Sequence, residues 1–303
     1  MRLLSRVLLS IIFCGISLAQ QYQPSVDFTG LMNLRFYNQS GGFMIENLTM
    51  IFPPDNYNSI EFEITTPSGE SEYKTGLRLQ KWDNLPAFAN LAPNGPGIVH
   101  LEQTGNFIIN IKVDSMVISR LPFTLKAEKN GDPFNPKVIY VREGPWKNLA
   151  YFSYEKERPG YLLKFNWWMN STEVGSGKNA KITVHLMKGN KEIARSRGEV
   201  VVSDVNWQEF NYNLVTVGKK FRQFTINDLT KENGNYSVVL RADGKPFKTY
   251  SFTVSGGKVK ELPQNNLDYS PHEDFIASRV LDRSSGSNSS YKILNAVWVT
   301  TKN

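Results

Sequence analysis

The alternation of apolar and polar residues is organised around one hairpin pattern, in residues 234–255. Apolar residues alternate on both sides of Asp243-Gly244: Tyr236, Val238 and Leu240 before it, and Phe247, Tyr250, Phe252 and Val254 after it. An Asp-Gly pair between two such runs predicts a two-residue turn, since type I′ turns need positive φ at both central positions. This stretch is therefore predicted to form a β-hairpin.

The same pattern occurs a second time, in residues 105–126, which align with 234–255 at a constant offset of 129 and without a gap. The shared residues are Gly105, Asn106, Asp114, Phe123 and Thr124, which recur as Gly234, Asn235, Asp243, Phe252 and Thr253. We interpret this as one module in tandem, each copy closing with the hairpin. The residues predicted to face the two cores are Ile109, Ile111, Phe123, Val238, Leu240 and Phe252.

Further strand-like runs fill the rest of both halves. They cover 28–37, 43–51, 59–65, 73–80 and 97–103 in the first half, and 148–154, 160–170, 180–187, 191–203, 207–215 and 221–226 in the second. Only 82–95, in the first half, is compatible with a helical turn. Short strands at this spacing, without a sustained helical period, favour an all-β fold of two β-sandwiches.

The chain begins with a pattern typical of a secretory signal peptide. Arg2 and Arg6 precede an apolar run, and Ser17-Leu18-Ala19 supplies the small residues of a cleavage site after Ala19. The run is shorter than the roughly 20 apolar residues that span a membrane. We therefore expect an exported protein, periplasmic or extracellular, without a transmembrane segment after cleavage.

These patterns divide the chain into four parts. They are the signal peptide at 1–19, a first β-sandwich at 20–130, a second at 131–256, and a linker and C-terminal tail at 257–303. Residues 127–147 are interpreted as the linker and the first strand of the second module.

The tail ends in a run, residues 290–300, that is too apolar to be left in water. It follows a short helix predicted in 271–282 and a Ser-rich spacer. The run predicts a final strand that docks on the second module. Strand addition to a neighbouring molecule is the alternative.

Composition limits the chemistry that this chain can perform. Cys14 is the only cysteine and lies in the predicted signal peptide, so disulfides and thiol chemistry are excluded from the mature chain. The formal net charge is +7, but it is unevenly placed. Residues 20–130 carry 8 basic and 11 acidic side chains, whereas 131–256 carry 19 and 12. The asymmetry bears on partners rather than on fold.

The strand predicted at 160–170 has the alternation of a sandwich strand. Leu163, Phe165 and Trp167 share its inner face, and Trp168 points the other way. Together with the closing hairpins, residues 28–256 resemble the tandem immunoglobulin-like modules of exported bacterial proteins. In this resemblance Tyr236 takes the place of the tyrosine corner, whereas Phe107 has no hydroxyl for that role and both cysteines of antibody domains are missing. The resemblance implies a fold and no activity.

No catalytic, cofactor or metal motif is present. His100, His185 and His272 lie far apart, and His185 is expected to be a satisfied histidine within a strand. The stretch 175–179 resembles a phosphate loop, but Asn179 replaces the Ser or Thr that would hold magnesium. Turn chemistry explains the polar residues of 130–136 without calcium. The sequence therefore predicts no enzymatic activity, no cofactor, no metal and no nucleic-acid partner.

Two patches are candidate ligand sites. The aromatic candidates, which could stack on sugar rings, are Trp146, Trp168 and Trp207; the basic candidates are Lys188, Lys191, Arg195 and Arg197, with Lys219, Lys220 and Arg222 on another turn. The basic residues could meet an acidic polymer or membrane headgroups. Core packing and protection of edge strands are the alternative explanations for the two sets.

The leading hypothesis from the sequence is a non-enzymatic structural or interaction protein of the bacterial cell envelope. An envelope protein or a polysaccharide would be its partner, and the oligomeric state stays open. Carbohydrate binding through exposed tryptophans is the alternative, and a hydrolase with a site built from loops is a third hypothesis.

Overall fold

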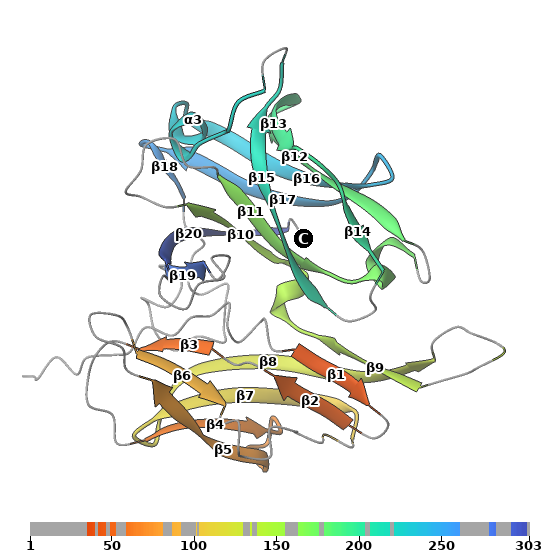
Figure 1. Cartoon of the computed structure of the whole chain (residues 1–303), viewed down its shortest axis with the longest axis vertical. Coiled ribbons are helices and arrows are strands. Elements are labelled where there is room, and N and C mark those ends of the chain that lie inside the picture. Colours follow the sequence, from red (N-terminus) through yellow and green to blue (C-terminus); the bar gives the residue numbers. More distant parts are fainter. Residues whose placement is uncertain are drawn as a thin grey trace, which may run out of the picture.

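The structure of the chain is a computed structural model. It describes residues 35–39, 42–46, 49–52, 59–80, 87–91, 101, 103–129, 134, 138–154, 163–175, 179–203, 207–218, 221–260, 279–282 and 292–301. Two β lobes follow one another along the long axis (Figure 1). All strand pairs are antiparallel, which confirms the predicted all-β class, and the described residues contain a single short α-helix. The predicted signal peptide, 1–19, lies outside the described residues.

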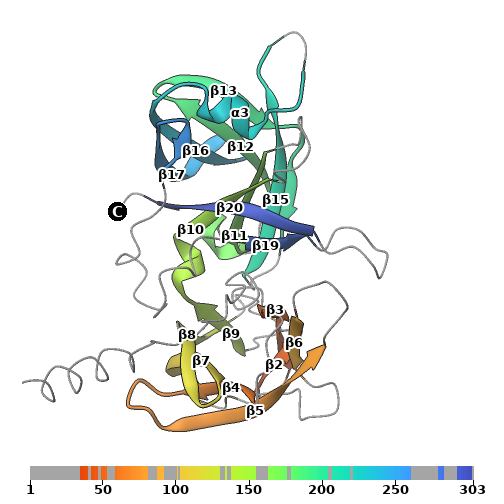
Figure 2. The ribbon, with the colours of Figure 1, turned by 90° about the vertical axis from the view of Figure 1, so that its left-hand side faces the viewer.

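The described residues of the first lobe form nine strands. They are β1 (Arg35–Gln39), β2 (Gly42–Glu46), β3 (Thr49–Phe52), β4 (Ile60–Thr65), β5 (Ser71–Gln80), β6 (Ala87–Leu91), β7 (Gly105–Val113), β8 (Met116–Lys129) and β9 (Val138–Glu143). β1 and β2 pair with each other, and the other strands form a sheet in the order β3-β6-β5-β4-β7-β8-β9. Figure 2 shows this sheet curling from β8 through β5 to β6.

The second lobe contains the remaining elements. They are the 3-10 turn η1 (Pro145–Lys147), β10 (Leu149–Tyr154), β11 (Lys164–Met169), the 3-10 turn η2 (Ser171–Val174), β12 (Ala180–Lys188), β13 (Lys191–Ser196), β14 (Val200–Val202), β15 (Gln208–Thr216), α3 (Ile226–Thr230), β16 (Gly234–Ala242), β17 (Lys245–Ser255), β18 (Lys258–Val259), β19 (Arg279–Asp282) and β20 (Lys292–Thr301).

The second lobe is a closed barrel of eight strands. Its order is β17-β16-β12-β13-β15-β11-β10-β20, and β20 also pairs with β17, which closes the ring. Closure leaves none of these eight strands at an open edge. The expected sandwich is therefore replaced here by a barrel.

The two lobes share one strand order. The series β3-β6-β5-β4-β7-β8 in the first lobe matches β11-β15-β13-β12-β16-β17 in the second, position by position. In each series three antiparallel neighbours are followed by a strand that returns beside the first of them, which is a Greek key. The returning strands are β7, beside β4, and β16, beside β12.

Both predicted hairpins are present, and their details correspond at the offset of 129. The turns have positive φ at both central residues: Asp114 and Ser115 in the first, Asp243 and Gly244 in the second. Both aspartates accept a backbone hydrogen bond from a neighbouring strand, at 2.8 Å from Ser59 and 3.1 Å from Lys181. The ladders shift register at matching places, after Ile111 and after Leu240.

The core faces agree with the predicted alternation. The six residues expected inside are all buried: Ile109, Ile111, Phe123, Val238, Leu240 and Phe252. The Tyr236 hydroxyl donates a hydrogen bond of 2.7 Å to the carbonyl of Glu232, four residues upstream. This is the contact that a tyrosine corner makes. Tyr236 and Phe252 stack at 5.6 Å, as Phe107 and Phe123 do in the first lobe.

The predicted tail strand is confirmed. β20 pairs with β10 over Leu149–Tyr154 and with β17 at Tyr250 and Ser251, within the same chain. Val297 and Val299 of β20 are buried. The tail at 257–303 thus supplies a strand of the barrel rather than an accessory to a finished domain.

Other predicted elements differ from the structure. Residues 87–91, in the segment compatible with a helical turn, form β6, and residues 279–282, within the predicted tail helix, form β19. The predicted strand at 221–226 is an isolated bridge at Gln223 followed by α3. β9 pairs with β8, so residues 138–143 complete the first sheet and the second lobe begins its pairing at β10. β6 becomes a strand through its pairing with β3 and β5, whereas α3 is stabilised locally by a capping box of Thr225 and Asp228.

Among the described strands, the first part of β8 has an open edge at the place where the second lobe is closed. β20 pairs with β17 at Ser251, and the residue that corresponds to Ser251 at the offset of 129 is Pro122 of β8. Proline has no N–H to give to an added strand, and it is typical of edge strands. Pro122 is exposed, and the described part of β8 before Thr124 pairs only with β7.

Candidate functional site

The three candidate tryptophans are all buried. Trp146 is 1% exposed, Trp168 0% and Trp207 5%. Trp168 does lie on the opposite face from Trp167, but that face is covered as well, and its ring packs at 5.7 Å from that of Tyr151. The expectation of an outward-facing Trp168 was therefore wrong. Alternation shows which side of a strand a residue occupies, whereas a barrel strand can be covered on both sides.

A buried ion pair lies at the end of the barrel next to the first lobe. Lys248 of β17 lies 2.8 Å from Glu173 of η2, with the two side chains 9% and 15% exposed. The Lys248 ammonium lies 5.5 Å from the Trp207 ring centroid and 5.8 Å from that of Tyr250. We call this set, with Ser171, the proximal cluster.

Burial perturbs the acid–base groups of the proximal cluster. It raises the pKa of Glu173 and lowers that of Lys248, while their mutual attraction opposes both shifts. It also raises the pKa of Tyr250 well above its usual value. Four buried polar atoms here have no hydrogen-bond partner: Ser171 Oγ, Glu173 Oε2, Trp207 Nε1 and Tyr250 Oη. Because these atoms have almost no accessible surface, the proximal cluster is closely packed and keeps these four polar atoms buried without a hydrogen-bond partner.

The proximal cluster continues into the connection between the lobes. Arg142, on β9, is buried, and one of its terminal nitrogens donates to the carbonyl of Trp207 at 3.4 Å. Its guanidinium lies 5.0 Å from the Trp146 ring centroid, and burial lowers its pKa to about 9. Two of the three candidate tryptophans thus join the first lobe to the barrel.

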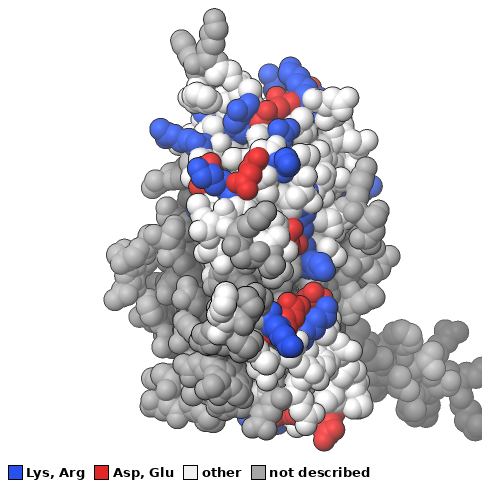
Figure 3. All heavy atoms as spheres, turned by 90° about the vertical axis from the view of Figure 1, so that its right-hand side faces the viewer, with Lys and Arg blue, Asp and Glu red and all other residues white. Residues whose placement is uncertain are grey.

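The basic candidates are spread over two regions of the barrel. Arg195 lies on the outer wall, where Glu192 accepts from both Arg195, at 3.0 Å, and His185 Nδ1, at 2.8 Å. Because a carboxylate only accepts, His185 donates from Nδ1 to Glu192, and its Nε2 shares a hydrogen bond of 2.9 Å with the Thr183 hydroxyl. His185 is therefore a satisfied histidine, as expected. Figure 3 shows basic and acidic side chains interleaved over the barrel half of one face.

The Thr183–His185–Glu192 series has the order of a nucleophile relay. An acyl-transfer site also needs donors aimed at the developing oxyanion. β12 pairs with β16 on one side and with β13 and β14 on the other, and between those two the N–H of Val184 donates to the Ser196 hydroxyl at 3.1 Å, so the Val184 N–H is not available as an oxyanion donor. We therefore interpret the hydrogen bonds of Thr183, His185 and Glu192 as structural contacts on the outer surface of the barrel.

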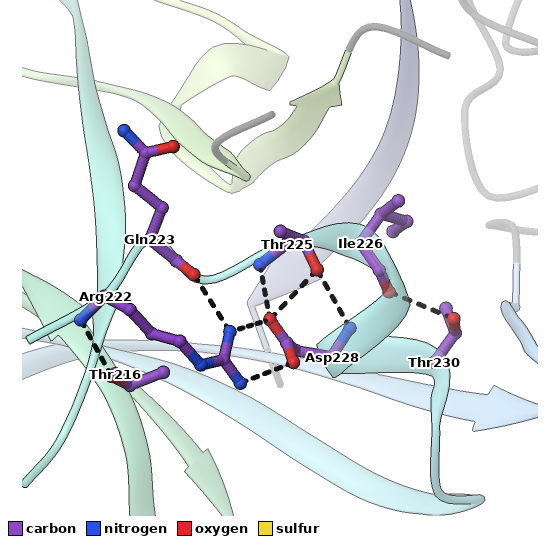
Figure 4. Close-up of polar contacts among 7 residues, drawn as sticks. All are labelled: Thr216, Arg222, Gln223, Thr225, Ile226, Asp228 and Thr230. Atoms are coloured by element: carbon purple, nitrogen blue, oxygen red, sulfur yellow. Dashed lines mark hydrogen bonds and ion pairs between the residues drawn. The ribbon is translucent and has the colours of Figure 1, made fainter. Parts of the chain in front are cut away.

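Of the other described basic candidates, Lys188, Lys191 and Arg222 lie at the opposite end of the barrel, whereas Arg197 follows the end of β13 that is remote from the β12–β13 turn. Lys188 pairs with Glu232, while Lys191 and Arg197 are exposed. Arg222 binds Asp228 through two hydrogen bonds of 2.7 Å (Figure 4). Lys219 and Lys220 lie outside the described residues.

This end carries exposed apolar residues that the sequence reasoning missed. After β15 the chain turns back on itself: Thr216 N donates to the carbonyl of Arg222 at 2.8 Å, and Phe224 N to that of Leu214 at 2.9 Å. Within the turn, Val217 is 40% exposed and Phe221 72%. We call this turn, the β12–β13 turn and α3 the distal end; it lies away from the first lobe (Figures 1 and 2). The missed signal was an aromatic residue between basic ones in 217–222.

The Arg222–Asp228 contact holds the base of this turn. Asp228 also accepts from the backbone N and the hydroxyl of Thr225, and Thr225 accepts from Asp228 N, which completes a capping box on α3. The arginine holds the pKa of Asp228 down at about 2. Figure 4 shows these contacts of Arg222, Thr225 and Asp228, which begin one residue after Phe221.

No protein-family model, no curated protein and no solved structure matches this chain. Within the described ranges, no three His, Cys, Asp or Glu residues come together in a way that would hold a metal ion. The same ranges contain no helix with the length and apolar character needed to cross a membrane.

Proposed function

We propose that the chain is an exported, non-enzymatic structural or interaction protein of the cell envelope, assembled from two copies of one β module. The shared strand order and the matching turns and register shifts support the duplication. The residues at 1–19, with two arginines before an apolar run, support export.

The observation that carries the interaction role is the contrast between the two ends of the barrel. The proximal cluster is buried and joined to the first lobe, whereas the distal end exposes Val217 and Phe221 among basic residues. Exposed apolar side chains rimmed by charge are typical of interaction sites. We therefore place the contact with the envelope at the distal end.

The alternative of carbohydrate binding by tryptophan stacking lacks the surface it requires, because Trp146, Trp168 and Trp207 are buried. A cleft gathering carboxylates or His272 would favour the third hypothesis, a hydrolase with a site built from loops, and His272 lies outside the described residues.

Retention on an envelope fraction tests the proposed role. The purified full chain is mixed with washed envelope membranes, and the bound share is compared for wild type, the double variant Lys191→Glu/Phe221→Ser, and Phe134→Ser. Phe134 is 97% exposed in the first lobe and is the matched control. We expect the double variant to lose retention and Phe134→Ser to keep it. Equal retention of all three proteins would remove the distal end from the proposal.

A further inference from the structure

We propose that the distal end docks on an anionic phospholipid surface, with Phe221 and Val217 entering the headgroup region. This proposal rests on the proposed function and names an anionic phospholipid surface as the partner of the distal end. The observation behind it is that apolar and basic residues occur together at one free end of the barrel: Val217 and Phe221, with Lys188, Lys191, Arg222 and Lys231.

These residues are brought to the same end by the sheet register. Lys188 and Lys191 flank the β12–β13 turn, and Val217 N donates to the carbonyl of Ile193 at 3.4 Å, beside that turn. Lys231 follows α3, and Glu232, the next residue, pairs with Lys188. The basic side chains therefore lie around the turn that carries Phe221.

The charge at this end is positive among the described residues. Asp228 is bound by Arg222 and Glu232 by Lys188, which leaves Lys191 and Lys231 in excess, both exposed. A basic residue near an anionic bilayer contributes about 1 kcal/mol, or roughly a fivefold gain in binding. Such a surface would not be attracted to a neutral bilayer by charge.

The apolar residues distinguish a bilayer from a soluble acidic polymer. A polyanion in water pairs with lysines but offers no medium into which an aromatic ring can transfer. An interface does so, and aromatic and aliphatic residues beside Lys and Arg are what interfacial anchors combine. Phe221 is suited to this because it is exposed while the base of its turn is braced by Arg222 and Asp228.

Cosedimentation with protein-free vesicles tests the proposal. The full chain is mixed with vesicles of phosphatidylcholine alone and of phosphatidylcholine with phosphatidylglycerol. We expect binding only to the anionic vesicles, and weaker binding as salt screens the charges. Phe221→Ser should reduce the partition coefficient about tenfold or more, since an apolar side chain of this size is worth more than one power of ten when buried. Lys191→Ser should reduce it about fivefold.

Phe134→Ser is the matched control, since it removes an exposed phenylalanine from the other lobe and should leave the partition coefficient unchanged. Circular dichroism and thermal melts of Phe221→Ser should match wild type, because the side chain is exposed. Wild type that stays in solution with anionic vesicles, or equal binding of wild type and Phe221→Ser, overturns the proposal.

A second comparison distinguishes failure of the lipid inference from failure of the proposed function. If the distal-end double variant loses retention on the envelope fraction while wild type ignores protein-free vesicles, a protein or polysaccharide meets this end and the lipid inference is overturned alone. Binding to soluble heparin that survives Phe221→Ser has the same meaning, because it shows a polyanion site without insertion.

Discussion

At the scale of single residues, two ion pairs of the barrel differ in their exposure to solvent. Lys248 and Glu173 are nearly excluded from water, and their attraction offsets a desolvation cost that each would otherwise bear alone. Arg222 and Asp228 make a more exposed pair at the other end of the barrel. The two pairs should therefore respond differently to mutation and to pH.

The buried pair predicts a non-additive stability cycle. Lys248→Met leaves Glu173 buried without its partner and should lower the free energy of unfolding by about 3–5 kcal/mol. Glu173→Leu should have a comparable effect on Lys248. The double variant should recover most of the loss, because two apolar side chains need no partner. Urea unfolding of the four proteins checks this, and additive losses would contradict it.

The exposed pair predicts a pH dependence at acid pH. The pKa of Asp228 is lowered from 3.8 to about 2, so its contribution is complete above the unfolded value and is lost as pH falls toward the folded one. Because Arg222 is 60% exposed, solvent reduces the effect to about 1 kcal/mol. Wild type should lose this stability between about pH 5 and pH 2. Asp228→Asn should lack that part of the slope in urea unfolding, and an unchanged slope would contradict the assignment.

At the scale of elements, the closing hairpins are the best-specified parts of the chain. Their turns, register shifts and inward faces follow from residues that are neighbours in sequence, so the sequence was sufficient to predict them. Elements whose residues lack a strand-like pattern were predicted less well. β6 follows a tryptophan and contains alanines and an asparagine, and only its pairing with β3 and β5 makes it a strand.

Phe252 links the second hairpin to the rest of the barrel, since its ring packs on Tyr236 and on Phe152 at 5.1 Å. Phe252→Ala should lower the free energy of unfolding by about 3–5 kcal/mol, the usual range for a buried phenylalanine. Chemical denaturation measures the loss, with exposed Phe134→Ala as control. A change below about 1 kcal/mol would show that the ring is not part of the core.

Pro122 predicts a change in association. Pro122→Ser restores an N–H on the edge of β8, at the place where Ser251 of β17 pairs with β20. Since an open edge is a template for strand addition, the variant should form dimers or larger species. Light scattering after size-exclusion chromatography reports the molar mass. Pro246→Ser, in β17, is the control, because Pro246, like Pro122, pairs with the preceding strand of its hairpin but lies in the closed barrel.

At the scale of the whole molecule, the barrel depends on a strand that is remote in sequence. The apolar character of 290–300 was enough to predict that it docks, but not that it completes a ring with β10 and β17. Strand order depends on which edges remain free after the Greek key has formed, and no local pattern records that. The burial of Trp168 was missed for a related reason, because the alternation in 160–170 does not show what covers the outer face.

Deletion of residues 285–303 tests this closure. Without β20, the edges of β10 and β17 lose their partner and the buried Val297 and Val299 are removed. We expect a lower melting temperature and increased binding of a dye for apolar surface, at unchanged molar mass. A fall of the molar mass by half would show that β20 is exchanged between copies in solution. An unchanged melting temperature would contradict the closure.

The position of β20 also has a consequence for biogenesis. β10 ends at Tyr154, whereas its partner β20 begins at Lys292. During synthesis, the edge of β10 that pairs with β20 therefore has no partner until the residues between the two strands have been made. The first lobe needs no residue beyond β9 for its sheet and can fold early. The barrel must wait, and such late, long-range pairing is slow and exposes edges that aggregate. A holding chaperone would therefore be required mainly by the second half of the chain.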